Sequence, residues 1–276
     1  MSNPLSKHFR QPVIYLKLPS GGKYYPDGSL EIGASGEIPI YSITIKDELM
    51  LKTPDALMNG ESVSNMIRSC CPAIKDPGII PAVDLDPLLI AIRIASYGST
   101  MEVSSKCPHC QAENDHQVDL NHALSMVSVM KKYQEPRQIG SLVFEFRPRN
   151  FNELNQMGRT TFEQRKLIQV VTDSELPQEE KLARFTEGFK ALATMNVETV
   201  ASAIRSVTTD ERVVVTDTSQ IAEFIANADR KTYEEIKDTI NDYVNANTMK
   251  SIDMPCVECE KLYPVNLEFN QSTFFE

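Results

Sequence analysis

Two Cys-x-x-Cys pairs are the residues of this sequence whose types and spacing could do chemistry: Cys107 with Cys110, and Cys256 with Cys259. A structural zinc ion takes four thiolate or imidazole ligands in a tetrahedron, and two such turns at the tips of β-hairpins form a zinc ribbon. We therefore predict one structural Zn²⁺ per chain, bound by these four cysteines. A zinc ion held by four thiolates has no open position for water, so this site would not catalyse hydrolysis.

The distance between the two pairs along the chain is unusual for a zinc ribbon. In a compact ribbon the pairs lie about 15–20 residues apart, whereas 145 residues separate Cys110 from Cys256. We therefore predict a split zinc ribbon, with residues 121–250 inserted between its hairpins. A metal ion that joins the pairs would also tie the ends of this insertion together and constrain the unfolded chain.

Other interpretations of the histidines and cysteines stay open. Either pair alone could be a thioredoxin-like redox motif, although such a motif normally opens a helix in a βαβ unit and neither pair does. The pairs could also be unrelated, or could be halves of a site shared between subunits. His109 and His116 lie close to the first pair and could replace a cysteine as ligand, whereas Cys70 and Cys71 are interpreted as small, partly buried apolar residues.

The elements that must position these cysteines indicate an α+β fold. Alternating apolar residues predict a small β unit over residues 12–45, and helices follow over residues 46–98. The clearest helix runs from Asp84 to Tyr97 with Asp86 as its cap, and another begins at Thr53-Pro54. Strand pairs surround each cysteine pair, over residues 101–120 and 251–270, and residues 150–249 are predicted to be almost entirely helical.

These elements predict four segments of the chain. They are a flexible N-terminal lead (1–11), a β/α domain that ends in the first zinc knuckle (12–120), a mainly helical insertion (121–250), and a segment with the second zinc knuckle and the C-terminal tail (251–276).

Composition and charge narrow the class of protein. Hydrophobic residues make up 41% and charged residues 24% of the 276 residues, which suits an ordinary globular core. The net charge is −10, and residues 151–276 carry most of it, with 13 Lys and Arg against 22 Asp and Glu. An acidic surface repels phosphate backbones, so a nucleic-acid partner is not expected.

Several functional classes are not indicated. We expect no membrane span and no secretory signal, because no apolar segment approaches about 20 residues. In a reducing cytosol, the cysteines would be metal ligands or buried thiols rather than disulfides. The sequence has no G-x-S-x-G, Walker or H-E-x-x-H motif, and Ser20-Gly-Gly-Lys23 is typical of a tight turn. We therefore predict a protein that is not an enzyme and has no small-molecule substrate.

An ordered set of segments resembles a known family. The segments are residues 16–26 (LKLPSGGKYYP), 43–49 (ITIKDEL), 54–60 (PDALMNG), 88–98 (LLIAIRIASYG) and 107–110 (CPHC). In this order they resemble the baseplate hub and hub assembly proteins of T4-type bacteriophages with contractile tails. The resemblance covers residues 12–120, with a weaker match at the second cysteine pair.

The resemblance implies a non-enzymatic role as a tail baseplate hub component or a hub assembly factor. The partners would be other phage tail baseplate and hub proteins. The location would be the host cytoplasm during assembly and the tail baseplate of the virion. Two other functions are weighed beside this one: a zinc-ribbon regulator that binds nucleic acid, and a thiol oxidoreductase.

Overall fold

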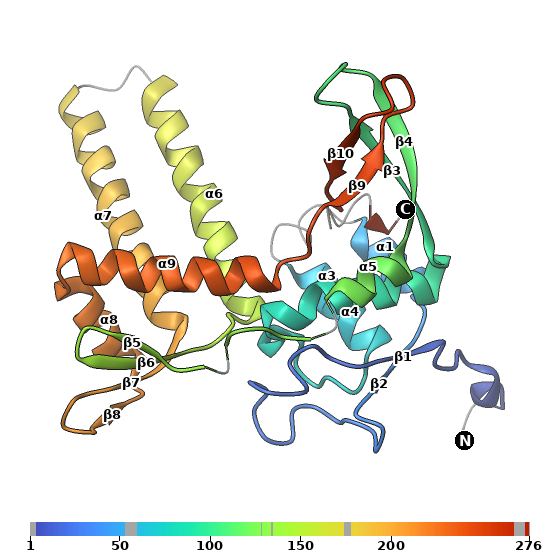
Figure 1. The fold of residues 1–276 in the computed structure, drawn as a ribbon, viewed down its shortest axis with the longest axis horizontal. Coiled ribbons are helices and arrows are strands. Elements are labelled where there is room, and N and C mark those ends of the chain that lie inside the picture. Colours follow the sequence, from blue (N-terminus) through green and yellow to red (C-terminus); the bar gives the residue numbers. More distant parts are fainter. Residues whose placement is uncertain are drawn as a thin grey trace. The chain divides into compact units, whose positions relative to one another are not determined.

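The chain has a mixed α+β fold with small antiparallel sheets, as predicted (Figure 1). The computed structural model describes residues 4–52, 60–127, 129–133, 135–173, 178–267 and 274–275, and the helix predicted to begin at Thr53-Pro54 lies outside them. The chain divides into two compact units. Unit 1 comprises Met1–Met130 and Thr248–Glu276, and unit 2 comprises Lys131–Asn247.

Unit 1 begins with a short antiparallel pair of strands, β1 (Ile14–Leu16) and β2 (Ile38–Ile40). Leu30, in a predicted strand, forms only an isolated bridge with Ile74. Outside the cysteine hairpins, the described part of unit 1 also contains four α-helices and two 3-10 helices. They are η1 (Ser6–His8), α1 (Ile45–Leu51), α3 (Glu61–Cys70), η2 (Pro77–Ile79), α4 (Ala82–Tyr97) and α5 (Leu120–Met126).

Helix α4 provides much of the core of unit 1. Its residues from Leu88 to Ile92 are all buried, which is typical of a helix enclosed by its own domain. The prediction that Asp86 caps this helix is wrong, because α4 already begins at Ala82, with Pro81 as N-cap. Pro87 therefore lies inside the helix, where it removes one backbone hydrogen bond, and the burial of the apolar residues after it offsets that loss.

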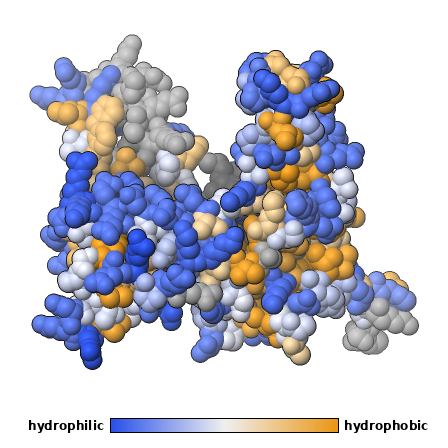
Figure 2. Space-filling view, viewed as in Figure 1, coloured by the Kyte–Doolittle hydropathy of each residue, from blue (hydrophilic) through white to orange (hydrophobic). Residues whose placement is uncertain are grey.

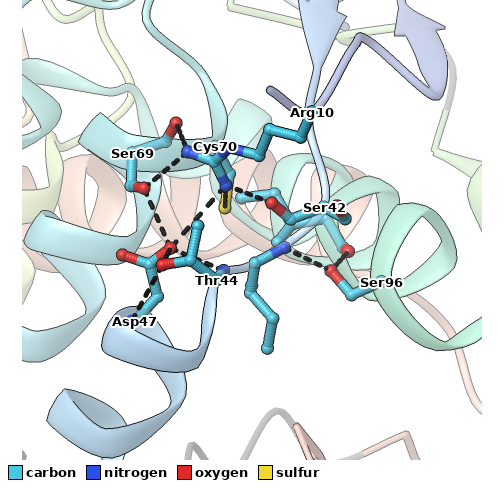
Figure 3. Close-up of polar contacts among 9 residues, drawn as sticks. Arg10, Ser42, Thr44, Asp47, Ser69, Cys70 and Ser96 are labelled. Atoms are coloured by element: carbon cyan, nitrogen blue, oxygen red, sulfur yellow. Dashed lines mark hydrogen bonds and ion pairs between the residues drawn. The ribbon is translucent and has the colours of Figure 1, made fainter. Parts of the chain in front are cut away.

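A polar cluster joins the start of α1 to the end of α3 (Figure 3). One carboxylate oxygen of Asp47, Oδ2, accepts hydrogen bonds from the backbone N–H of Thr44 (2.8 Å), from the Thr44 hydroxyl (2.7 Å) and from the Ser69 hydroxyl (2.9 Å). The Arg10 guanidinium donates to Ser69 Oγ and to the backbone oxygen of Ser42, and it lies 3.7 Å from Asp47. The cluster thus fixes the chain at Arg10 against two helices.

Unit 2 is largely helical, as predicted, but it also contains a four-stranded antiparallel sheet in the order β5–β6–β7–β8. The strands are β5 (Arg137–Ile139), β6 (Leu142–Phe146), β7 (Ile204–Thr208) and β8 (Val214–Val215). The helices are α6 (Phe151–Asp173), α7 (Gln178–Ser202), α8 (Thr218–Asn227) and α9 (Arg230–Asn247).

Capping explains one helix boundary of unit 2, and the sheet explains an error in the prediction of another. Asn150 and Glu153 exchange side chain to backbone hydrogen bonds of 2.8 and 2.9 Å, and this capping box begins α6. From its short polar side chain, Asn196 is expected to cap a new helix, but this expectation is wrong, because α7 continues through Asn196 to Ser202. Ile204, predicted to lie on a helix, instead pairs with Phe146 in the sheet.

The core of unit 2 is aromatic. The ring of Phe146 stacks with that of Phe144 at 6.1 Å between centroids and meets the edge of Tyr243 at 5.4 Å. The outward side of α9 is hydrophilic (Figure 2). The two ends of the unit are joined directly, because the Asn247 side chain accepts from the backbone N–H of Lys131 (2.7 Å) and donates to its oxygen (2.9 Å).

Candidate metal centre

Two β-hairpins of unit 1 carry the cysteine pairs (Figure 1). Strands β3 (Thr100–Lys106) and β4 (Glu113–Asp119) form the first, and β9 (Ile252–Pro255) and β10 (Leu262–Val265) form the second. Burial alternates along β4, where the even-numbered residues are buried and the odd-numbered ones are exposed. Each hairpin therefore has one inner face, and each cysteine pair lies at the turn between its strands.

The structure brings all four predicted cysteines together. Their sulfur atoms lie within 4.8 Å of one another and could hold a metal ion. The Sγ atoms of Cys107 and Cys259 are 3.8 Å apart, and those of Cys110 and Cys256 are 3.5 Å apart. Two segments that are distant in the sequence thus form one four-thiol cluster, which is consistent with a split zinc ribbon.

The two cysteine turns have the same backbone geometry. In the first turn, Gln111 N–H donates to the Cys107 oxygen at 2.9 Å, and in the second turn, Glu260 N–H donates to the Cys256 oxygen at 2.9 Å. Gln111 (φ 66°) and Glu260 (φ 59°) both adopt the left-handed conformation, which is strained for residues other than glycine. The repeated strain shows that each turn is held in one particular shape.

The turns also affect the acidity of the thiols. Hydrogen bonds from the backbone N–H groups of Cys259 and Glu258 lower the pKa of Cys256 to about 6. The backbone N–H of Ala112 favours the Cys110 thiolate in the same way. Desolvation and the hydrogen bonds with the other three cysteines nevertheless raise the pKa of Cys110 to about 12. The cluster thus loses a first proton readily and resists the loss of another, a resistance that a bound cation would relieve.

Polar side chains join the two hairpins beside the sulfur cluster. The Tyr263 hydroxyl of β10 forms hydrogen bonds with Ser105 Oγ of β3 (2.7 Å) and His116 Nε2 of β4 (2.9 Å). The Asn114 Oδ1 atom of β4 accepts from the backbone N–H of Val257 in the second turn (2.7 Å). We call the four residues Ser105, Asn114, His116 and Tyr263 the inter-hairpin clasp.

Sequence reasoning did not identify the clasp. It considered His116 only as an alternative ligand, and His116 instead bonds to Tyr263. The side chain of His109 is not in the sulfur cluster, although its backbone N–H donates to Cys107 Sγ at 3.4 Å. The signal that could have indicated the clasp is the alternation along β4, which places Asn114 and His116 on the same face as the apolar Val118.

The sulfur cluster lies at the edge of a small apolar core. Cys107 and Cys256 are buried together with Tyr263 and Val265, while Cys110 is exposed. Hydrophobic residues also reach the surface over β9 and β10 (Figure 2), where Val257 is 76% and Leu262 is 64% exposed. One side of the cluster is therefore reachable from solvent, while the other is sealed by apolar side chains.

The outward face of the first hairpin is acidic. Its exposed positions on β3 and β4 carry Lys106 beside four carboxylates, those of Glu102, Glu113, Asp115 and Asp119. Phosphate backbones would be repelled by such a face. This charge disfavours nucleic-acid binding through the ribbon.

The remaining cysteines, Cys70 and Cys71, are buried and lie outside the cluster. Burial raises the pKa of each to about 12. A raised pKa disfavours the thiolate, which is the reactive form of cysteine. They were expected to be partly buried apolar residues, and the structure shows both to be fully buried.

The fold and the sulfur cluster define a mixed α+β protein with a split cysteine ribbon that could hold a metal ion. A family model described as T4 bacteriophage base plate protein matches residues 11–276, and the chain belongs to this family. Neither the curated proteins nor the solved structures gave a significant match.

Membership of this family supports several of the predictions in their broader form. It is a structural family of the phage baseplate, generally non-enzymatic, which implies a location in the virion tail and other baseplate proteins as partners. Among the described residues, none of the helices combines the length and the apolar character needed to cross a membrane.

Proposed function

We propose that this protein is a baseplate hub component or hub assembly factor whose unit 1 is stabilised by one structural zinc ion. The observation that carries the zinc part is the convergence of four thiols from segments 145 residues apart. Family membership over residues 11–276 carries the baseplate part. The hub role is more specific than membership of the baseplate family, and it is supported by the ordered resemblance of residues 12–120 to hub proteins.

The geometry of the sulfur cluster fits zinc. A tetrahedron with Zn–S bonds of about 2.3 Å places its sulfur atoms about 3.8 Å apart. Two of the six sulfur–sulfur separations are 3.8 and 3.5 Å, and all six lie within 4.8 Å. Four soft thiolate donors favour zinc over magnesium or calcium, which prefer oxygen ligands. We therefore assign Cys107, Cys110, Cys256 and Cys259 as the ligands.

A structural metal ion has a clear purpose at this place in the chain. The small hairpin β9–β10 follows directly after unit 2 in the sequence, and by itself a two-stranded hairpin is only marginally stable. A zinc ion bound by both hairpins would fix the returning chain to unit 1. It would stabilise the fold by a free energy that grows with the logarithm of its affinity, and it would provide no open position for catalysis.

The segments of the chain then have separate roles in the proposal. Residues 12–120 and 251–276 form the zinc-stabilised body, and the helical insertion 121–250 provides a surface for other baseplate proteins. Two large apolar side chains of α7 support this assignment, because Leu182 is 67% and Phe189 is 63% exposed. Exposed aromatic and aliphatic side chains of this size commonly mark protein interfaces.

Co-purification from phage-infected cells tests the proposal. A tagged chain is expected to recover tail hub proteins, and a variant with both Leu182→Ser and Phe189→Ser is expected to recover less of them. The matched control carries Val213→Ser and Val214→Ser, which replace exposed apolar residues near β8. Recovery of baseplate proteins without any hub protein would refute the hub role, and recovery of no tail protein would refute the baseplate role.

A further inference from the structure

We infer that the inter-hairpin clasp is a set of positioning residues that holds the two hairpins together before metal binds. The inference rests on the proposed zinc site and concerns how that site is formed. The clasp brings the four thiols into one place, so that the metal ion enters a site that already exists. Its residues contact no metal and act only through the position of the cysteines.

The first argument is that the clasp joins the hairpins without using any sulfur atom. Its three bonds connect residues 158, 147 and 143 positions apart in the chain. The phenol of Tyr263 is shared by Ser105 and His116, so one hydroxyl ties β10 to both strands of the first hairpin. The clasp therefore links the hairpins by contacts that are separate from any bond to a metal ion.

The second argument is burial. Asn114 is 2%, His116 is 6% and Tyr263 is 2% exposed. Buried polar groups are costly to leave without partners, and each of these side chains finds its partner on the opposite hairpin. Separation of the hairpins would break all three bonds together, so the clasp favours the docked arrangement by itself.

The third argument is the position of Asn114. Its Oδ1 atom accepts the backbone N–H of Val257, which lies inside the second cysteine turn, directly after Cys256. Its Nδ2 atom donates to the oxygen of Ala112, next to the first turn (3.0 Å). One side chain therefore sets the orientation of one cysteine turn relative to the other.

The consequence concerns metal affinity. Without the clasp, each binding event must dock and order the two hairpins, and that entropy is lost at the moment of binding. With the clasp, this ordering has already occurred. The loss of one buried hydrogen bond between the hairpins corresponds to a change in affinity of up to about tenfold, and we expect an effect of about that size here.

Competition for zinc with a chromophoric chelator tests the inference on the full chain. Ser105→Ala and Tyr263→Phe should each weaken zinc affinity about tenfold while zinc content at saturation stays at about one ion per chain. The matched control is Ser104→Ala, because the neighbouring hydroxyl bonds to Asp115 within the same hairpin (2.6 Å). This exposed change should alter affinity by less than about twofold.

Hydrogen exchange of the metal-free protein gives a second measurement. Peptides covering residues 100–119 should be protected in the unsubstituted chain and should exchange faster in Tyr263→Phe, but not in Ser104→Ala. Unchanged affinity and unchanged protection in both clasp variants, with one zinc still bound, would overturn the clasp and leave the zinc proposal standing. If the unsubstituted chain binds no zinc, the zinc proposal fails and the inference fails with it.

Discussion

Replacement of Asp47 by alanine should destabilise unit 1 by about 3 kcal/mol. The carboxylate caps α1 through Thr44, and the loss of such a cap costs about 1 kcal/mol. The same oxygen accepts from Ser69 and lies beside Arg10, and hydrogen bonds to a charged group contribute about 1.5–3 kcal/mol. Asp47 is 6% exposed, so water cannot easily replace these partners.

Hydrogen exchange read by mass spectrometry is the suitable assay, because it reports on peptides from each unit separately and the chain has no tryptophan for fluorescence. The matched control is Asp217→Ala, which removes the exposed cap of α8 in unit 2. That carboxylate accepts only from the backbone N–H groups of Ser219 and Gln220. Its loss should cost about 1 kcal/mol.

The comparison of the two variants can refute the reasoning. If Asp47→Ala costs no more than Asp217→Ala, then Asp47 is only a helix cap, and the contacts with Ser69 and Arg10 contribute nothing. Faster hydrogen exchange confined to α1 would likewise show that the contacts of Asp47 with Ser69 and Arg10 contribute nothing. The polar cluster predicts that α3 and the chain around Arg10 lose protection together with α1.

Further predictions concern the strained turns, a buried acid and the core of unit 2. Gln111→Gly and Glu260→Gly should each raise stability by up to about 1 kcal/mol, because they relieve left-handed strain; a lower melting temperature in both would contradict this. Burial raises the pKa of Asp84 from its ordinary value of 3.8 to about 6. The Asp84 carboxyl should therefore account for a loss of about 3 kcal/mol in the stability of unit 1 as pH rises from about 4 to 6. Burial also raises the pKa of Asp86 to about 6, so urea unfolding of Asp84→Asn should show a smaller loss over this range than the unsubstituted chain, and an equal loss would contradict the role of Asp84. Phe146→Ala should destabilise unit 2 by about 3–5 kcal/mol in denaturant unfolding and leave the zinc content unchanged.

Features with local signals were predictable from the sequence. Within the region predicted to be helical over residues 46–98, Gly60 and Pro72 indicate the limits of one helix, and α3 (Glu61–Cys70) lies between them. The short polar side chains near the helix starts predict caps at Asn150 or Asn152, at Ser219 and at Asp229. Asn150 and Asp229 do bond to backbone N–H groups two or three residues further on, whereas the cap of the helix expected from Ser219 is Asp217. In each case the residues that determine the boundary are neighbours in the sequence.

Features that depend on distant partners were not predictable. Strand β7 contains three β-branched residues, yet it begins only one residue after the end of α7, and its pairing with β6 and β8 makes it a strand. Asn196 has the side chain of a cap, but it also tolerates an exposed position inside a helix, so α7 passes through it. Local propensity cannot decide such cases, because tertiary pairing overrides it.

In the candidate site, too, the features with local signals were predictable and those that depend on distant partners were not. The spacing within each Cys-x-x-Cys pair indicates a knuckle, and the need for four ligands links the two pairs despite their separation. No such rule links Tyr263 to Ser105 or Asn114 to Val257, since a tyrosine or an asparagine in a strand has many possible partners. The clasp is a property of the packed hairpins, and only the structure shows it.

Zinc content of the purified protein tests the central claim most directly, with the unsubstituted chain, Cys256→Ser and Cys71→Ala measured together. Cys71 is buried but lies outside the cluster, so it controls for the loss of a thiol. The account predicts about one zinc ion per chain in the unsubstituted protein and in Cys71→Ala, and almost none in Cys256→Ser. A chain without zinc, or a Cys256→Ser variant that retains its full zinc content, would contradict it.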